Sequence, residues 1–178
     1  MKEKPAVFLD RDGVLIKEKG YIACKEDIEI FSYTAECIKQ IKQKGYYAIV
    51  ITNQSGIARG YFTEANLCEI NQYLVYNTGV DAVYYCPHHP CGKIEKYKYV
   101  CHCRKPDIGL FERACKDFNI DMSKSYMVGD RASDILAGQN VGVKTILLES
   151  GYGSLKLEGS VIPDYILEDL QEVLEILE

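Results

Sequence analysis

The chain has 178 residues, of which 47% are apolar and 26% are charged, as is usual for a globular protein and unlike a disordered one. Its 21 basic and 26 acidic residues give a net charge of −5 without a basic block, which argues against binding of duplex nucleic acid. No stretch approaches the about 20 apolar residues of a membrane span, and the run at residues 6–9 is too short for a signal peptide. We therefore expect one cytoplasmic, monomeric domain over residues 1–178, with neither a nucleic acid nor a membrane as partner.

Short apolar runs alternate with helical patterns in the first half of the chain. Strands are predicted at residues 6–9, 46–52 and 80–85. Apolar residues recur at helical spacing over residues 34–44, and again in a segment that Thr63 can cap and Gly79 can end.

Residues 86–106 differ from what precedes them, because Cys, His, Pro, Lys and Tyr follow one another there without periodicity. A loop of this length in a compact domain needs a function or a staple. The remaining predicted elements are helices at 107–118 and 133–139, strands at 125–128 and 145–148, and an amphipathic tail helix over 167–177.

The alternation of strands and helices predicts an α/β fold, a Rossmann-like parallel sheet with helices on both faces. Ligands of such sheets bind beyond the carboxyl ends of the strands. Polar, chemically capable residues follow four of the predicted strands, at residues 10–13, 52–56, 104–106 and 129–134. We expect these four clusters to meet at one edge of the sheet.

The first cluster, Asp10-Arg11-Asp12-Gly13, would by itself more often be a surface turn. The four clusters in order carry more weight: Asp-x-Asp-Gly-Val, then Thr-Asn, then Lys-Pro, then Gly-Asp-x-x-x-Asp. This series resembles the haloacid dehalogenase superfamily of phosphatases over residues 7 to about 150. A phosphate-accepting receiver domain is a weaker alternative, because strand three leads here into cysteines instead of an acceptor aspartate.

The resemblance implies covalent phosphoryl transfer. Asp10 would be the nucleophile, and Asp12 would protonate the leaving alkoxide and then deprotonate the attacking water. Thr52 and Asn53 would donate hydrogen bonds to the transferring oxygens, and Lys105 would neutralise charge.

Two carboxylates facing an anionic phosphate require a cation, and Mg²⁺ prefers oxygen ligands. The resemblance places Mg²⁺ on the Asp10 carboxylate, the Asp12 backbone carbonyl and the Asp130 carboxylate, with Arg131 adjacent. Asp134 is either a further ligand, a carboxylate just outside the ligand set, or a helix-capping residue.

A second metal is indicated by the loop at residues 86–103, in which Cys-x-His is followed after twelve residues by Cys-x-Cys. Three thiolates and one imidazole suit a closed, structural Zn²⁺ site. Family resemblance selects Cys86, His88, Cys101 and Cys103 as ligands and leaves His89, His102 and Cys91 out, with Cys91 as a plausible replacement. The metal would fix the loop that carries Arg104 and Lys105.

No cap domain fits between the motifs, so selectivity must come from short loops. The compact, zinc-stapled form resembles the D-glycero-D-manno-heptose 1,7-bisphosphate 7-phosphatases and their histidinol-phosphatase relatives, through stretches such as Cys86-Pro87-His88-His89-Pro90 and Cys103-Arg104-Lys105-Pro106. One departure is Arg131, which stands where heptose members commonly have lysine. Substrate contacts implied by this resemblance are Glu18, Lys19, Gly20, Tyr21, Thr52, Asn53, Gln54, Ser55 and Arg104.

A sugar bisphosphate has a second phosphate remote from the reacting one, and the guanidinium of Arg59 or Arg104 could hold it. We therefore expect a Mg²⁺-dependent phosphatase that acts on a small phosphorylated sugar, removing the 7-phosphate of the heptose bisphosphate in cell-surface glycan precursor synthesis. Histidinol-phosphate hydrolysis is the close alternative, and a non-catalytic zinc-stapled binding module is the distant one.

Overall fold

A parallel sheet of six strands runs through the protein, whose computed structural model describes residues 3–152 and 161–178. The strand order is β3-β2-β1-β4-β5-β6, and every neighbouring pair is parallel. The strands are β1 (Ala6–Leu9), β2 (Tyr47–Asn53), β3 (Ala82–Cys86), β4 (Tyr126–Gly129), β5 (Lys144–Leu148) and β6 (Tyr165–Leu167).

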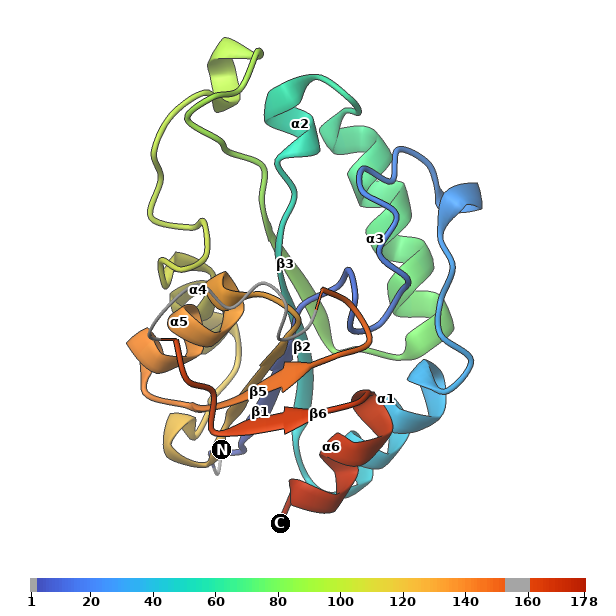
Figure 1. The fold of residues 1–178 in the computed structure, drawn as a ribbon, viewed down its shortest axis with the longest axis vertical. Helices are drawn as coiled ribbons and strands as arrows, with labels where there is room; N and C mark the ends of the chain where they lie inside the picture. The colour runs from blue at the N-terminus through green and yellow to red at the C-terminus, as the bar shows by residue number, and fades with distance from the viewer. Residues whose placement is uncertain (1–2, 153–160) are drawn as a thin grey trace.

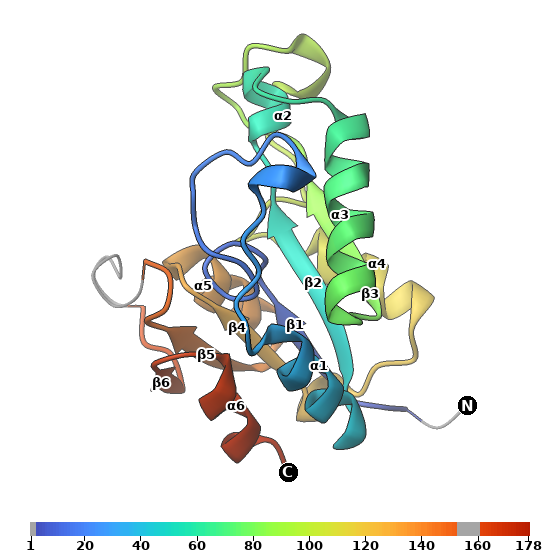
Figure 2. The same ribbon diagram turned by 90° about the vertical axis from the view of Figure 1, so that its right-hand side faces the viewer.

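Helices cover both faces of the sheet (Figures 1 and 2), as expected. They are α1 (Thr34–Gln43), α2 (Gly56–Arg59), α3 (Glu64–Thr78), α4 (Gly109–Asp117), α5 (Ala132–Val141) and α6 (Leu170–Ile176). Strand β1 shows why both faces are buried: Val7 and Leu9 pack into the core under α1, α3 and α6, while Ala6 and Phe8 pack under α4 and α5. The ring of Phe8 meets that of Phe111 edge-on, at 4.9 Å between centroids.

The predicted boundaries of α3 are confirmed by its caps. Thr63 and Asn66 form a reciprocal capping box at its start, and Gly79 ends it in the left-handed conformation at φ 76°. The tail was predicted incorrectly at one point, because Leu167 closes the short strand β6 and the last helix begins only at Leu170. Helix α2 was also not anticipated, since its four residues are too few to show a period.

The strand order places β1 between β2 and β4, so the chain leaves the carboxyl ends of β1 and β4 toward opposite sides of the sheet. A crevice therefore forms at this edge, where α/β folds bind their ligands. Asp10 follows β1 directly, and its backbone N–H donates to the carbonyl of Val128 in β4 at 2.9 Å. The motif residues after the two strands are thus neighbours in space.

The long segment between β3 and α4 contains the predicted zinc ligands, and we call it the metal loop. It includes a short 3₁₀ helix at Glu95–Tyr97. Figure 2 shows this loop beside α2 at one end of the molecule, and the backbone N–H of Ile94 donates to the carbonyl of Ala58 at 2.9 Å. Across residues 3–152 and 161–178, no cap domain is inserted between the motifs. Access to the crevice is therefore shaped by short loops.

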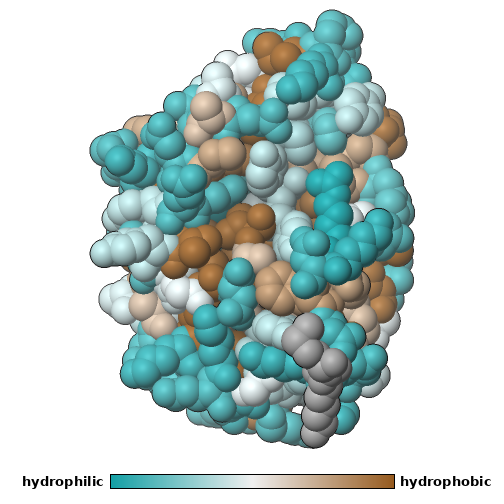
Figure 3. Space-filling model, turned by 180° about the vertical axis from the view of Figure 1, so that it is seen from behind, coloured by the Kyte–Doolittle hydropathy of each residue, from teal (hydrophilic) through white to brown (hydrophobic). Residues whose placement is uncertain are grey.

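The face seen from behind in Figure 3 is mostly hydrophilic, with a smaller apolar area near its middle. Large apolar side chains that are more than three-quarters exposed are Tyr76, Val100 and Ile162. Within residues 3–152 and 161–178, no helix combines the length and the apolar character that a bilayer span needs.

Candidate active site

Three carboxylates meet at the crevice. Asp10, Asp130 and Asp134 each bring one oxygen within 4.8 Å of the other two, and their exposed fractions are 7%, 0% and 1%. Asp10 is placed by the end of β1, Asp130 by the end of β4, and Asp134 by the first turn of α5. We call these three residues, together with Lys105, the acid cluster.

Lys105 is the cation of the acid cluster, and its side chain is 1% exposed. Its Nζ lies 3.1 Å from Asp10 Oδ1 and 2.6 Å from Asp134 Oδ1, and donates to the carbonyl of Ile51 at 2.6 Å. Burial lowers the pKa of Lys105, but Asp10 and Asp134 outweigh this and raise it, so the ammonium stays charged. Asn53 holds the backbone of Lys105 by two reciprocal hydrogen bonds of 3.1 and 3.0 Å.

One ammonium does not balance three buried carboxylates. Burial, and then the charges of Asp10 and Asp134, raise the pKa of Asp130 to about 7. Burial also raises that of Asp134, to about 6, although Lys105 opposes the shift. Among the described residues, no hydrogen bond reaches Asp130 Oδ1, whose nearest cation is Arg131 Nε at 3.8 Å. A buried, oxygen-only and partly unpartnered donor set of this kind fits a hard divalent cation.

Glycines let the backbone approach Asp130 closely. Gly13 has φ 80°, and a Cβ built on it would lie 2.5 Å from Asp130 Oδ2. Gly151 also packs against this carboxylate, and the next backbone N–H, from Tyr152, donates to its Oδ2 at 2.9 Å. Any larger side chain at position 13 would therefore displace Asp130 as well as strain the turn.

Asp12 lies outside the acid cluster and is held by two other side chains. Arg11 Nε and Nη2 donate to its two oxygens at 3.1 and 3.0 Å, and Gln54 Nε2 donates to Oδ2 at 2.9 Å. The same amide also donates to the hydroxyl of Thr52 at 2.9 Å. Gln54 was expected to touch substrate, and sequence gave no sign of this link between Thr52 and Asp12.

A cavity of about 260 Å³ opens over these residues. Of the residues predicted from sequence to act in catalysis or substrate contact, it is lined by Asp10, Asp12, Glu18, Gly20, Tyr21, Asn53, Gln54, Ser55, Arg104 and Lys105. Arg131, predicted beside the magnesium site, also lines it; its Nη2 pairs with Glu18 Oε2 at 2.8 Å, and its guanidinium lies 4.3 Å from the ring of Tyr152. Most of the predicted set therefore comes together in one place.

Three predicted residues do not line this cavity. Thr52 is 1% exposed and lies behind Gln54. Lys19 points away, with its Nζ 3.2 Å from Glu29. Arg59 Nη2 lies 3.2 Å from His89 Nε2, on the side of the metal loop.

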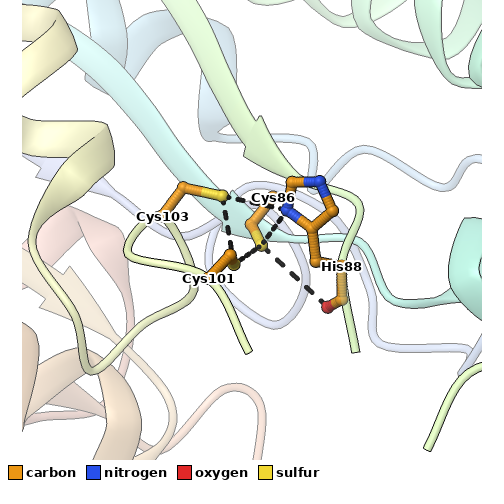
Figure 4. A group of neighbouring side chains, drawn as sticks. All are labelled: Cys86, His88, Cys101 and Cys103. Carbon is orange, nitrogen blue, oxygen red and sulfur yellow. Dashed lines mark hydrogen bonds between the residues drawn. The ribbon is translucent and has the colours of Figure 1, made fainter. Parts of the chain in front are cut away.

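The predicted zinc ligands converge in a second group, the thiol cluster, formed by Cys86, His88, Cys101 and Cys103 (Figure 4). Its Sγ and Nδ1 atoms lie within 4.8 Å of one another, with Cys101 Sγ 3.4 Å from Cys86 and 3.3 Å from Cys103. Hydrogen bonds from Cys86, then Cys101 and His88, lower the pKa of the Cys103 thiol to about 5 despite burial. A closed set of one nitrogen and three sulfurs, with a thiol of lowered pKa among them, fits tetrahedral Zn²⁺, which binds cysteine as thiolate.

The residues left out of this set lie elsewhere. His102 pairs with Glu112 at 3.2 Å, and His89 accepts from the backbone N–H of Cys91 at 3.0 Å. A contact that the sequence did not reveal is that of the Tyr99 hydroxyl with His88 Nε2, at 2.7 Å. When zinc is bound, the tautomer in which Nε2–H donates to the Tyr99 oxygen would leave the Nδ1 lone pair for the metal.

Comparison with known proteins agrees with this geometry. Residues 102–173 match a family model described as "HAD-hyrolase-like". The chain is 42% identical over 176 residues to the D-glycero-beta-D-manno-heptose-1,7-bisphosphate 7-phosphatase of Haemophilus ducreyi, covering 96% of both chains. It is 39% identical over 175 residues to the protein of the same name from Vibrio cholerae, covering 96% of this chain and 94% of that one.

Solved structures give the same result. The D,D-heptose 1,7-bisphosphate phosphatase of B. bronchiseptica, complexed with magnesium and phosphate, has a TM-score of 0.82 at 29% identity, with 97% of each chain covered. A putative HAD-like phosphatase from Mesorhizobium loti has a TM-score of 0.83 at 29% identity, covering 99% of this chain and 87% of that one. This chain therefore belongs to the family of the D-glycero-beta-D-manno-heptose-1,7-bisphosphate 7-phosphatases.

Proposed function

We propose that this protein is a phosphoric monoester hydrolase that removes the 7-phosphate of D-glycero-D-manno-heptose 1,7-bisphosphate through an aspartyl phosphate on Asp10. The observation that carries the proposal is the meeting of Asp10, Lys105, Asp130 and Asp134 at the switch point of the sheet, in a chain related over its length to phosphatases of that name. The names of these relatives specify the beta anomer, and we propose the same preference here.

The acid cluster positions the nucleophile. Asp10 Oδ1 accepts a hydrogen bond from the backbone N–H of Arg11 at 2.8 Å and forms an ion pair with Lys105 Nζ at 3.1 Å. Asp10, Asp130 and the backbone carbonyl of Asp12 are the proposed ligands of Mg²⁺, with Asp134 beside them and Arg131 adjacent. When bound, the cation offsets the repulsion between these carboxylates and the phosphate. Lys105 remains charged at neutral pH and shares that task.

Proton transfer falls to Asp12. As Asp10 forms a bond to phosphorus, the bond from phosphorus to the sugar oxygen breaks, and Asp12 gives its proton to that oxygen. Asp12 then takes a proton from water, which attacks phosphorus and breaks the bond to Asp10. Inorganic phosphate leaves, the Asp10 carboxylate is restored, and Asp12 again carries the proton it began with.

Substrate selection is assigned to the short loops around the cavity. Arg104 lines it and also donates from Nη1 to the carbonyl of His88 at 3.4 Å, which ties a phosphate-binding guanidinium to the metal loop. Glu18, Gly20, Tyr21, Asn53 and Ser55 also line it and would contact the sugar. Lys19 and Arg59 would have to turn from their present partners to reach a substrate.

Zinc in the thiol cluster would act structurally, by holding Cys103 and hence the two basic residues that follow it. Eight cysteines that are all free suit a reducing compartment, in keeping with the proposed cytoplasmic location and a role in cell-surface glycan precursor synthesis. We propose a monomer as the working form.

The test is release of phosphate by purified protein with Mg²⁺ from four substrates: the beta and alpha heptose 1,7-bisphosphates, the heptose 7-phosphate and histidinol phosphate. We expect kcat/KM for the beta bisphosphate to exceed each of the others at least about tenfold, because the second phosphate adds binding that the others lack or misplace. A larger value for histidinol phosphate would overturn the substrate assignment, and no release from any substrate would overturn the catalytic assignment.

A further inference from the structure

Arg11, the residue between the two motif aspartates, has an environment that the proposed mechanism does not use. Its side chain is 1% exposed, so its charge is almost completely removed from water. Within the residues that the structure describes, Asp12 is its one carboxylate partner at ion-pair distance. Burying a guanidinium is costly unless a well-placed anion compensates, so a buried pair at this point calls for an explanation.

The contacts form a closed ring. Arg11 binds both oxygens of Asp12, its Nη2 also donates to Gln54 Oε1 at 3.0 Å, and Gln54 Nε2 returns to Asp12 Oδ2 at 2.9 Å. Gln54 is itself 5% exposed and anchored on Thr52. The Asp12 carboxylate therefore has both oxygens occupied by planar donors in a fixed orientation.

The ring also keeps Asp12 apart from the acid cluster. Asp10, Asp130 and Asp134 share the grouping that could hold a cation, whereas the Asp12 carboxylate is not part of it. An aspartate only two residues past Asp10 could otherwise turn toward a cation. Holding it on Arg11 and Gln54 leaves its carboxylate available for proton transfer.

We propose that Arg11 is a positioning residue for the general acid–base Asp12: it fixes the orientation of the carboxylate and stabilises the negative charge that develops on it as its proton passes to the leaving oxygen. This inference rests on the proposed role of Asp12. Preorganised donors aimed at developing charge act mainly in the transition state, so the effect belongs to kcat more than to KM.

The test is a double-mutant cycle of Arg11→Gln and Asp12→Asn, with kcat measured on the heptose bisphosphate. We expect Arg11→Gln alone to lower kcat about 10²-fold with KM changed less than about threefold, since general acid–base catalysis contributes about 10²–10⁴. In the Asp12→Asn background the same change should lower kcat less than about twofold, because Arg11 acts through Asp12. Additive effects, or an unchanged kcat for Arg11→Gln, would overturn the inference.

A second readout uses 4-nitrophenyl phosphate, whose leaving group needs little protonation. Arg11→Gln and Asp12→Asn should each slow the sugar phosphate at least about tenfold more than the aryl phosphate. If Asp12→Asn fails to discriminate, the proposed role of Asp12 is wrong; if only Arg11→Gln fails to discriminate, the inference about Arg11 is wrong.

Two further variants serve as controls for the double-mutant cycle. Arg113→Gln, on the exposed surface of α4, should leave kcat unchanged. Arg11→Lys keeps a buried cation but cannot bind both oxygens of Asp12 as a guanidinium does, and it should give an intermediate kcat. If Arg11→Gln does not fold, Arg11→Lys takes its place in the cycle, and additivity with Asp12→Asn would again overturn the inference.

Discussion

The acid cluster and the thiol cluster differ in how the chain builds them. The acid cluster gathers residues from the ends of β1 and β4, the start of α5 and the end of the metal loop, whereas the thiol cluster lies entirely within residues 86–103. The acid cluster borders a cavity and carries unbalanced charge, while the thiol cluster is a closed set of four donors. Sites for chemistry keep an open position, and structural sites close theirs. Four variants, taken below from the largest expected effect to the smallest, test this contrast.

Replacing the proposed nucleophile should separate chemistry from folding most clearly. Asp10→Asn removes the nucleophile while keeping its volume, and kcat should fall at least about a thousandfold. The melting temperature should not fall, since one buried negative charge is removed from a crowded group. Steady-state phosphate release and a thermal melt check both points, and substantial residual turnover would count against covalent catalysis.

Disrupting the thiol cluster should have the opposite effect to Asp10→Asn: stability should be lost first. Cys103→Ser removes a buried metal ligand, and Tm should fall by roughly 5–10 °C with loss of bound zinc. Cys91→Ser is the matched control, because Cys91 is exposed in the same loop and outside the cluster. Calorimetry with zinc analysis decides the point; an unchanged Tm after verified zinc loss would refute the structural role.

The unbalanced charge of the acid cluster predicts that one substitution stabilises the protein. The raised pKa of Asp130, about 7 in the folded state, means that folding favours its protonated form. The stability that this provides is complete below about pH 4 and is lost as pH rises through about 7. Without Mg²⁺ at pH 8, the free energy of unfolding of Asp130→Asn, measured by urea denaturation, should therefore exceed that of the wild type by roughly 1–3 kcal/mol. This difference should shrink at pH 5.

With Mg²⁺ present, the wild type should be more stable than Asp130→Asn, because the cation stabilises only the chain that retains Asp130. Asp107→Asn, which replaces an exposed carboxylate outside the acid cluster, serves as the control. If Asp130→Asn destabilises the magnesium-free protein at pH 8, the acid cluster is not under electrostatic strain.

The smallest expected effect concerns the tyrosine behind the thiol cluster. Tyr99→Phe removes the hydroxyl that meets His88 Nε2 and should weaken zinc binding about 10–100-fold, as measured by competition with a chromogenic chelator. Tyr76→Phe, at an 88% exposed position, should bind zinc as the wild type does. Equal zinc affinity in both variants would show that Tyr99 does not orient the imidazole.

The sequence alone predicted those features that depend on the order and spacing of motifs along the chain. The strand-end clusters and the spacing of Cys86, His88, Cys101 and Cys103 are local patterns, and parallel strands bring their ends to one edge whatever the loops do. Contacts between side chains of different segments could not be obtained in this way. Nothing in the first motif marked Arg11 as the partner of Asp12, and nothing in the aperiodic loop marked Tyr99 as a partner of His88.

The remaining differences also have physical reasons. Strand β6 has only three residues, so its pattern is too short to separate from the helix that follows. Lys19 was assigned through the family resemblance and Arg59 from the chemistry of its guanidinium, but both side chains are long, and they lie against Glu29 and His89, which no linear motif reveals. Sequence therefore predicted the clusters well and the direction of individual flexible side chains poorly.

The most direct test of the central claim is to trap the covalent intermediate. Asp12→Asn protein is mixed with 4-nitrophenyl phosphate and Mg²⁺, quenched in acid, and the peptide carrying Asp10 is analysed by mass spectrometry before and after borohydride reduction. Because this leaving group needs little protonation, loss of the acid–base residue should slow hydrolysis of the intermediate more than its formation, so one phosphoryl group should appear on Asp10 and reduction should convert that residue to homoserine. A phosphoryl group on another residue, or turnover of wild-type protein with none found on Asp10, would contradict the account.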